Sequence, residues 1–182
     1  TFGITAGVTV NAAGARASTI MQAFGVSRRV PLVKAMNLVT ARPASDIALA
    51  APTATGQMLT LVPWQGRAII GTGQSKTLVE PDASGVTEGE VEAFIAEANQ
   101  AFPALRLTRD EVRLVHRGVV PAAEGQGGAP TLLSTPIVYD HAADNAAGAM
   151  TVIGVKYTTA RRVAQTVTER VANRLGKRLA PS

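Results

Sequence analysis

Short runs of β-branched and aliphatic residues, separated by Gly, Pro and Asn, are the feature that most constrains the fold of this chain. The clearest pair is formed by residues 58–62 and 67–71, which flank the segment Pro63-Trp64-Gln65-Gly66. A Pro and Gly turn between two β-rich runs predicts a β-hairpin. Further strands are predicted at residues 8–10, 30–40, 110–120, 132–140 and 150–154, with Pro136 interrupting the fourth of them.

Two segments have the residue spacing of amphipathic helices. Thr87 and Glu90 form a capping box, in which each side chain can bond to the backbone N–H of the other, so a helix is predicted to begin there. Near the end of the chain, Thr158 or Thr159 can cap a second helix, and Gly176 is its predicted stop. The predicted apolar faces are Val91, Phe94, Ile95 and Ala98 in the first helix, and Val163, Val167, Val171 and Leu175 in the second.

The order of these elements predicts the fold class. A strand and a short helical segment at residues 15–24 come first, several strands and a helix follow, and a strand and a helix end the chain. Blocks of antiparallel strands with a separate helix are typical of α+β proteins, whereas strand–helix pairs are typical of an α/β layer. We therefore expect an α+β fold: a mixed, mainly antiparallel sheet with flanking helices, and the edges of an α/β layer at both ends.

The chain is basic, with a net charge of +5 over 182 residues. The basic residues occur in separate groups, among them Arg28-Arg29 and Arg161-Arg162, and no aromatic platform lies beside them. Proteins that bind single-stranded nucleic acid need such platforms next to the positive charge. We therefore expect no nucleic-acid partner, while an anionic partner for the basic surface stays open.

The absence of cysteine excludes disulfides, thiolate metal sites and a thiol nucleophile. No apolar run approaches the roughly 20 residues that a membrane-spanning helix requires. The first residues also lack the charged and apolar regions of a signal peptide. We expect a cytoplasmic location, with peripheral association with the inner face of the membrane as the alternative.

Three segments resemble motifs of the FAD-dependent glycerol-3-phosphate dehydrogenases, within the wider group of D-amino-acid-oxidase-like flavoenzymes. Val10-Asn11-Ala12-Ala13-Gly14 is similar to the NAxG turn of that family. Residues 61–72 are similar to its PWxGRxxIGTT motif, and residues 154–161 are similar to its GGKxTTYR motif. The resemblance implies that the cofactor is FAD and that the substrate is a small molecule.

The resemblance also implies a domain organisation and a set of cofactor contacts. Residues 1–29 and 150–182 would belong to the FAD-binding layer, and residues 30–149 would form the substrate-binding domain. The positions that match the cofactor-binding motifs of the family are Asn11, Ala13, Gly14, Gly154, Val155, Lys156, Thr158 and Thr159.

The third motif has a chemical interpretation that does not depend on the family. Gly154 before a helix start allows the backbone to approach a ligand closely. The N–H groups and the dipole of a helix N-terminus favour negative charge, which a two-electron-reduced flavin carries at one edge of its ring. We expect Gly154, Val155, Lys156 and Thr158 at that edge, where the protein supplies electrostatics and the flavin supplies the hydride chemistry. An ordinary strand–helix turn with a Thr cap is the alternative.

Departures from the family motifs point to a different substrate. Val120 and Thr135 stand where the family has two arginines that bind the substrate phosphate. Because Arg–phosphate contacts are strong and bidentate, we expect an uncharged or carboxylate-bearing alcohol or amine in place of glycerol-3-phosphate. Asn37 replaces the His of the family's KGSH segment and, with Lys156, is a predicted catalytic residue. The predicted substrate-binding residues are Arg67, His116 and Arg117.

Both histidines are candidates for a general base, because the pKa of an imidazole is near neutral. His116 lies on a predicted strand, and His141 lies in a predicted loop. A structural or surface role is the alternative for each. His141 also forms a loose group of metal-ligand types with Asp140 and Asp144, but this spacing is not specific, and we expect no metal.

No G-x-G-x-x-G motif opens a strand–turn–helix unit in this chain. We therefore expect the pyrophosphate-binding segment upstream of Thr1, and the isolated chain to bind FAD weakly and to be inactive. The sequence predicts a portion of a flavin-dependent oxidoreductase that transfers a hydride from a small alcohol or amine to FAD. The alternative is a non-catalytic binding module derived from a flavoprotein.

Overall fold

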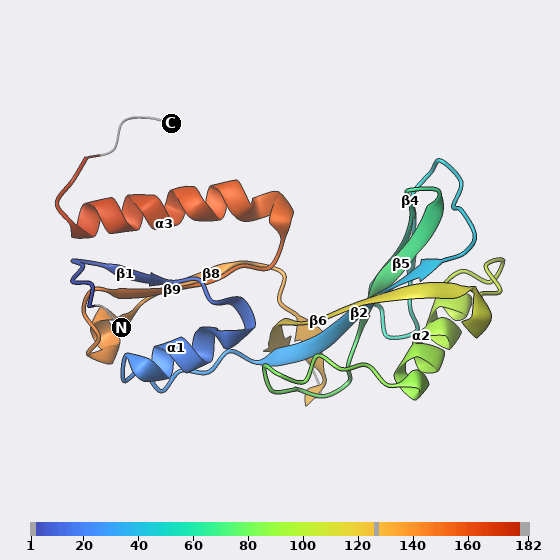
Figure 1. The fold of residues 1–182 in the computed structure, drawn as a ribbon, viewed down its shortest axis with the longest axis horizontal. Coiled ribbons are helices and arrows are strands. Elements are labelled where there is room, and N and C mark those ends of the chain that lie inside the picture. The colour runs from blue at the N-terminus through green and yellow to red at the C-terminus, as the bar shows by residue number, and fades with distance from the viewer. Residues whose placement is uncertain (1–2, 126–127, 179–182) are drawn as a thin grey trace. The chain divides into compact units, whose positions relative to one another are not determined.

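The computed structural model describes residues 3–125 and 128–178. Its contacts divide the chain into two compact units (Figure 1). Residues 1–32 and 120–182 form the first, here named the terminal unit, and residues 33–119 form the second, the central unit. Residues 120–149, which the sequence analysis groups with the substrate-binding domain, therefore lie in the terminal unit.

Twelve strands and α-helices are defined over the described residues. In chain order they are β1 (Thr9–Asn11), α1 (Ala17–Ala23), β2 (Leu32–Thr40), β3 (Leu49–Pro52), β4 (Met58–Trp64), β5 (Arg67–Gln74), α2 (Glu88–Ala101), β6 (Val112–Glu124), β7 (Pro130–Leu132), β8 (Ile137–Asp140), β9 (Ala149–Ile153) and α3 (Ala160–Arg174). Short 3₁₀ helices accompany them at Gly14–Arg16, Arg109–Glu111, His141–Asp144 and Tyr157–Thr159.

The central unit is a sheet with α2 against one face (Figure 1). Its strands follow the order β3-β4-β5-β2-β6, and β3, β4, β5 and β2 pair antiparallel with their neighbours. The predicted hairpin is confirmed as β4–β5, whose turn residues Gln65 and Gly66 both have positive φ angles, the geometry that matches the twist of paired strands. The apolar core between sheet and helix is built from side chains such as Leu38, Ile70 and Phe94.

The start of α2 confirms the predicted capping box. The backbone N–H of Glu90 donates to the hydroxyl of Thr87 over 3.3 Å, and the N–H of Thr87 donates to the Glu90 carboxylate over 2.7 Å. The buried positions of α2 are Val91, Phe94, Ile95 and Ala98, which is the predicted face. Local sequence rules therefore account for this helix completely.

The terminal unit contains a three-stranded sheet in the order β1-β9-β8, in which β1 is parallel and β8 antiparallel to β9. Figure 1 shows α3 on one side of this sheet and α1 on the other. The strand predicted at residues 132–140 proves to be two strands: β7 pairs with the end of β6, and β8 pairs with β9. The predicted α+β class with a mixed, mainly antiparallel arrangement is confirmed.

The beginning of α3 differs from the prediction. A 3₁₀ turn at Tyr157–Thr159 precedes the α-helix, and neither threonine provides a side-chain cap for it. The hydroxyl of Thr159 instead donates to the carbonyl of Lys156 over 3.0 Å. The end of α3 is as predicted, because Gly176 has a φ angle of 65° just after the helix. No helix in the described ranges is long and apolar enough to cross a membrane.

Candidate functional site

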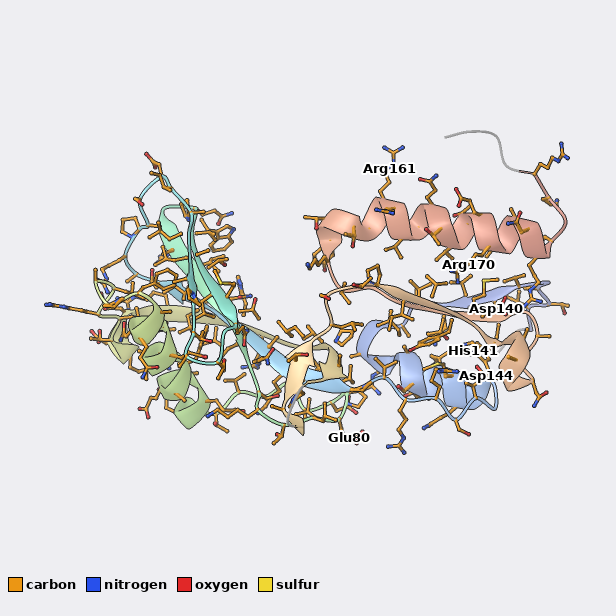
Figure 2. All side chains as sticks on the ribbon, turned by 180° about the vertical axis from the view of Figure 1, so that it is seen from behind. Glu80, Asp140, His141, Asp144, Arg161 and Arg170 are labelled. Atoms are coloured by element: carbon orange, nitrogen blue, oxygen red, sulfur yellow. The ribbon has the colours of Figure 1, made fainter. Side chains whose placement is uncertain are left out.

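The loop from β9 to α3 leaves a helix start open to solvent. Gly154 and Lys156 are exposed, and a Cβ added to Gly154 would meet no atom within 4 Å. The first turn of α3 carries no acidic residue, and Tyr157 is fully exposed. Figure 2 shows Arg161, in the first turn, pointing away from the sheet. Uncapped N–H groups with positive charge nearby can bind an anionic group.

The predicted contribution of each residue in this loop can now be placed. Gly154, Lys156 and Thr158 are exposed, and Val155 is half-buried. The hydroxyl of Thr159 is already engaged with the Lys156 carbonyl, so it does not cap the helix. The loop therefore offers backbone N–H groups and the ammonium of Lys156 to a ligand.

The turn after β1 is exposed, but its first side chain is not. Asn11 is 4% exposed, whereas Ala12, Ala13 and Gly14 are exposed. The Asn11 amide donates to the carbonyl of Ala17 over 2.9 Å, and its Oδ1 accepts the N–H of Ala13 over 3.1 Å. Gly14 has a φ angle of 58°, which favours glycine. The side chain of Asn11 thus shapes the turn, and only the backbone from Ala12 to Gly14 is open to a ligand.

A buried hydrogen-bonded group lies behind this turn, and the sequence analysis did not identify it. His141 is fully buried, with its Nδ1 2.8 Å from Asp144 Oδ2 and its Nε2 2.8 Å from Thr151 Oγ1. Asn11 Nδ2 donates to the same hydroxyl of Thr151 over 3.2 Å. Figure 2 shows His141 and Asp144 side by side. His141 and Asp144 are three residues apart on the short 3₁₀ helix after Asp140, and this spacing, which places both on one side, was the available signal.

These contacts favour the structural role of His141 over that of a general base. Its ring is buried and both nitrogens are engaged, so it is not available as a general base for a substrate. Within the described ranges, no group of three or more His, Cys, Asp and Glu side chains could hold a metal ion. The hydrogen bond from His141 lowers the pKa of the Asp144 carboxyl, and the Arg28 guanidinium, 3.5 Å away, acts in the same direction.

In the central unit, Asn37 lies on the sheet face opposite α2. The neighbouring Leu38 points into the core, and alternation from Leu38 to Asn37 turns Asn37 the other way, next to an irregularity in the strand register between Met36 and Asn37. Thr72 donates its hydroxyl to Asn37 Oδ1 over 3.1 Å. A Cβ at Gly71, the strand partner of Asn37, would lie 1.7 Å from that oxygen. Gly71, which belongs to the motif at residues 61–72, therefore provides the space for the Asn37 side chain.

The same face carries two of the three predicted substrate-binding residues. Arg67 and Trp64 pair across the hairpin on the side away from the core, and Arg67 donates to the carbonyl of Thr40 over 3.3 Å. The rings of Trp64 and His116 meet edge to face with centroids 5.8 Å apart, so His116 shares this face. Arg117 does not, because strand alternation turns it to the other side of β6. This set of Asn37, Trp64, Arg67 and His116 is named the open-face group.

Comparison with known proteins gives one consistent result. The family model described as "DAO: FAD dependent oxidoreductase" matches residues 1–170. A glycerol-3-phosphate dehydrogenase of Synechocystis is 34% identical over 122 residues, 66% of this chain and 22% of that protein. An aerobic glycerol-3-phosphate dehydrogenase of Staphylococcus aureus is 25% identical over 67% of this chain and 21% of that protein. The chain thus spans about a fifth of the length of these curated relatives.

Solved structures agree with this result. The FAD-complexed glycerol-3-phosphate dehydrogenase from Bacillus halodurans superposes with a TM-score of 0.74 at 25% identity, over 98% of this chain and 34% of that chain. The glycine oxidase from Geobacillus kaustophilus has a TM-score of 0.62 at 18% identity, over 96% of this chain and 43% of that chain, which is a likeness of fold.

Proposed function

Because this chain belongs to the family of FAD-dependent oxidoreductases, we propose that the protein it comes from oxidises a small alcohol or amine and passes the hydride to FAD. The observation that carries the proposal is the start of α3, which has no side-chain cap and no acidic residue in its first turn. Such a helix start stabilises negative charge next to it. FAD would supply the hydride acceptance, and the protein would supply binding and electrostatics.

The residues of the terminal unit fit an anionic ring edge. Gly154 has open space on its Cβ side, and Lys156 is exposed beside a helix start that has no side-chain cap. A carboxylate at this place would repel a reduced flavin, and the first turn has none. Gly154, Val155, Lys156 and Thr158 would hold that edge, and the exposed backbone of Ala13 and Gly14 would provide a second contact.

The open-face group supports a substrate-binding role for the central unit. Asn37 offers its amide nitrogen, Arg67 a positive charge, and Trp64 a partly exposed apolar ring packed on His116. The arginines that bind phosphate in the family are replaced by Val120 and Thr135. We therefore propose a substrate without phosphate, either uncharged or with one carboxylate that can pair with Arg67.

The replacement of three motif residues favours a second candidate function. Asn37, Val120 and Thr135 stand where the family has a His and two Arg residues. Neither an amide nor Val nor Thr can act as a general base of neutral pKa or as a bidentate phosphate ligand. A flavoprotein-derived module that binds a small molecule without oxidising it would also tolerate these changes.

One experiment separates the two candidates. The full-length protein is purified and its visible flavin absorption recorded, and then small alcohols and amines with and without a carboxylate are added under anaerobic conditions. Bleaching of the flavin band by one class identifies an oxidoreductase and its substrate class. A flavin band that no compound in the panel bleaches supports the binding module. A purified, folded protein without flavin, which stays without flavin when FAD is added, contradicts the oxidoreductase.

A further inference from the structure

A buried chain of hydrogen bonds runs through the terminal unit from Asp144 through His141 and Thr151 to Asn11. We propose that His141 is a positioning residue: it holds the turn from Asn11 to Gly14 in the conformation that receives the cofactor. The inference rests on the proposed function in one respect, the contact between this turn and FAD. Nothing in the family motifs read from the sequence points to His141.

The hydrogen bonds from Asp144 to Asn11 can be assigned one consistent set of donors and acceptors. The lowered pKa of Asp144 keeps its carboxylate ionised, so it accepts a hydrogen from Nδ1 of His141. In the neutral ring, Nε2 is then an acceptor, and it takes the hydroxyl hydrogen of Thr151. The oxygen of Thr151 can accept from the Asn11 amide, whose own Oδ1 accepts the N–H of Ala13. His141 thus determines which way the hydroxyl of Thr151 points.

Burial makes each of these bonds important. His141 and Thr151 are 0% exposed and Asn11 is 4% exposed, so water cannot replace a lost partner. In the described part of the chain, every buried side-chain nitrogen and oxygen has a hydrogen-bond partner. An unpaired buried polar group is strongly unfavourable, and removal of one member is therefore expected to move the others.

This series of hydrogen bonds ends at an exposed turn. Beyond Asn11 the backbone of Ala12, Ala13 and Gly14 is exposed, and Asn11 also ties this turn to the start of α1 through the carbonyl of Ala17. A carboxamide does not relay protons at neutral pH, so the chain does not deliver protons to the turn. The remaining role is to fix the conformation of the turn before the cofactor binds, which lowers the entropy loss on binding.

The test compares three variants of the full-length protein. Thr151→Val has nearly the same shape as threonine and lacks the hydroxyl, and Thr151→Ser keeps the hydroxyl. Val26→Ala is the matched control. Val26 is buried in the same unit just after the end of α1, and it takes no part in the hydrogen bonds that link Asp144, His141, Thr151 and Asn11. The dissociation constant for FAD is measured on flavin-stripped protein, together with amide hydrogen exchange of the peptide that contains Ala13.

We expect Thr151→Val to weaken FAD binding about tenfold or more, the effect of one unpaired buried group. Its Ala13 peptide should exchange faster even without FAD, whereas Thr151→Ser should restore both values to nearly those of the wild type. Val26→Ala should lower the melting temperature and leave both values unchanged. If Thr151→Val does not fold, Asp144→Asn replaces it, since Asp144 is partly exposed and its loss releases the ring of His141; weaker FAD binding with faster exchange is again expected.

The outcomes separate the two proposals. Unchanged FAD affinity and unchanged exchange in Thr151→Val, or changes equal to those of Val26→Ala, overturn the positioning role and leave the proposed function intact. A wild-type protein that binds no FAD contradicts the proposed function, and with it the role of the turn in receiving the cofactor. In that case, exchange of the Ala13 peptide in Asp144→Asn, which releases the ring of His141, still decides whether His141 holds the turn.

Discussion

Helices α2 and α3 have almost the same length, 14 and 15 residues, but they begin in opposite ways. The start of α2 is closed, because Thr87 and Glu90 satisfy each other's backbone groups. The start of α3 has no side-chain cap. The two helices also differ in packing, with four buried residues in α2 and one, Ala172, in α3.

This difference shows how the same element can serve two purposes. Amide groups that are bonded within the protein stabilise the fold, whereas amide groups left open can stabilise a ligand. α2 packs on the sheet through its apolar face, and the capping box at its start bonds the first amide groups within the protein. The start of α2 therefore stabilises the helix and is not open to a ligand. α3 is held mainly along its length, where Arg170 donates to the carbonyl of Val138 and Arg174 pairs with Asp140. Its start is exposed at Lys156 and Thr158 and carries no side-chain cap.

The largest expected effect comes from the apolar face of α2. Phe94 is 3% exposed and packs on the sheet, so Phe94→Ala should destabilise the central unit by about 3–5 kcal/mol. The half-buried Val163 of α3 is the matched position, and Val163→Ala should cost about 1 kcal/mol or less. Amide hydrogen exchange in each helix reports both values. Equal losses would show that α3 is packed as tightly as α2.

The helix caps provide the second comparison. Thr87→Ala removes a side-chain acceptor at the start of α2 and should destabilise that helix by about 1 kcal/mol. Thr159→Ala removes a hydroxyl that does not cap α3 and should change its stability by less than about 0.5 kcal/mol. Exchange rates of the first-turn amides in the two variants are the measurement. A loss at Thr159 as large as that at Thr87 would contradict an uncapped start.

Acid should act first on the start of α2. Lys34 and the N–H of Thr87 lower the pKa of Glu90, and Arg109 lowers the pKa of Glu88. A carboxyl with a lowered pKa in the folded state contributes stability that is present above its ordinary value of 4.5 and is lost as the pH falls through the folded value. Exchange in α2 should therefore accelerate below about pH 4.5, and exchange in the first turn of α3, which has no acidic residue, should not. Parallel acceleration of both helix starts would argue against this assignment.

The smallest effect is expected at the ion pair between α3 and β8. Arg174 lies 2.5 Å from Asp140, but the two side chains are 34% and 40% exposed, so water screens the pair. Arg174→Met should therefore destabilise α3 by about 0.2–1 kcal/mol, less at high salt. Thermal unfolding at two salt concentrations measures this. A loss of several kcal/mol would mean that the pair is the main attachment of α3.

Local signals in the sequence predicted most of the elements. The Pro63–Gly66 turn and the Thr87–Glu90 box depend on neighbours a few residues apart, and both are confirmed. The prediction that a threonine caps α3 was wrong. The hydroxyl of Thr159 donates to the Lys156 carbonyl, and a 3₁₀ turn precedes the helix. Spacing alone does not distinguish a donating from an accepting hydroxyl.

Features that depend on distant partners could not be predicted. The burial of His141 requires Thr151 and Asn11, and the last of these is separated from Thr151 by 140 residues. The division at 119/120 likewise depends on contacts between the two ends of the chain. Arg117 was predicted to bind substrate together with His116, although strand alternation turns adjacent residues to opposite sides. The contact of His116 with Trp64 was not foreseeable from spacing.

The central claim is that the start of α3 stabilises the negative edge of the reduced flavin, and the midpoint potential tests it most directly. Lys156→Met removes one positive charge at the helix start, and Lys177→Met removes the same charge just beyond the end of the helix. In the full-length, flavin-loaded protein, the first variant should lower the two-electron potential by on the order of 30 mV, and the second should leave it unchanged. Equal potentials in both variants and the wild type would contradict the claim.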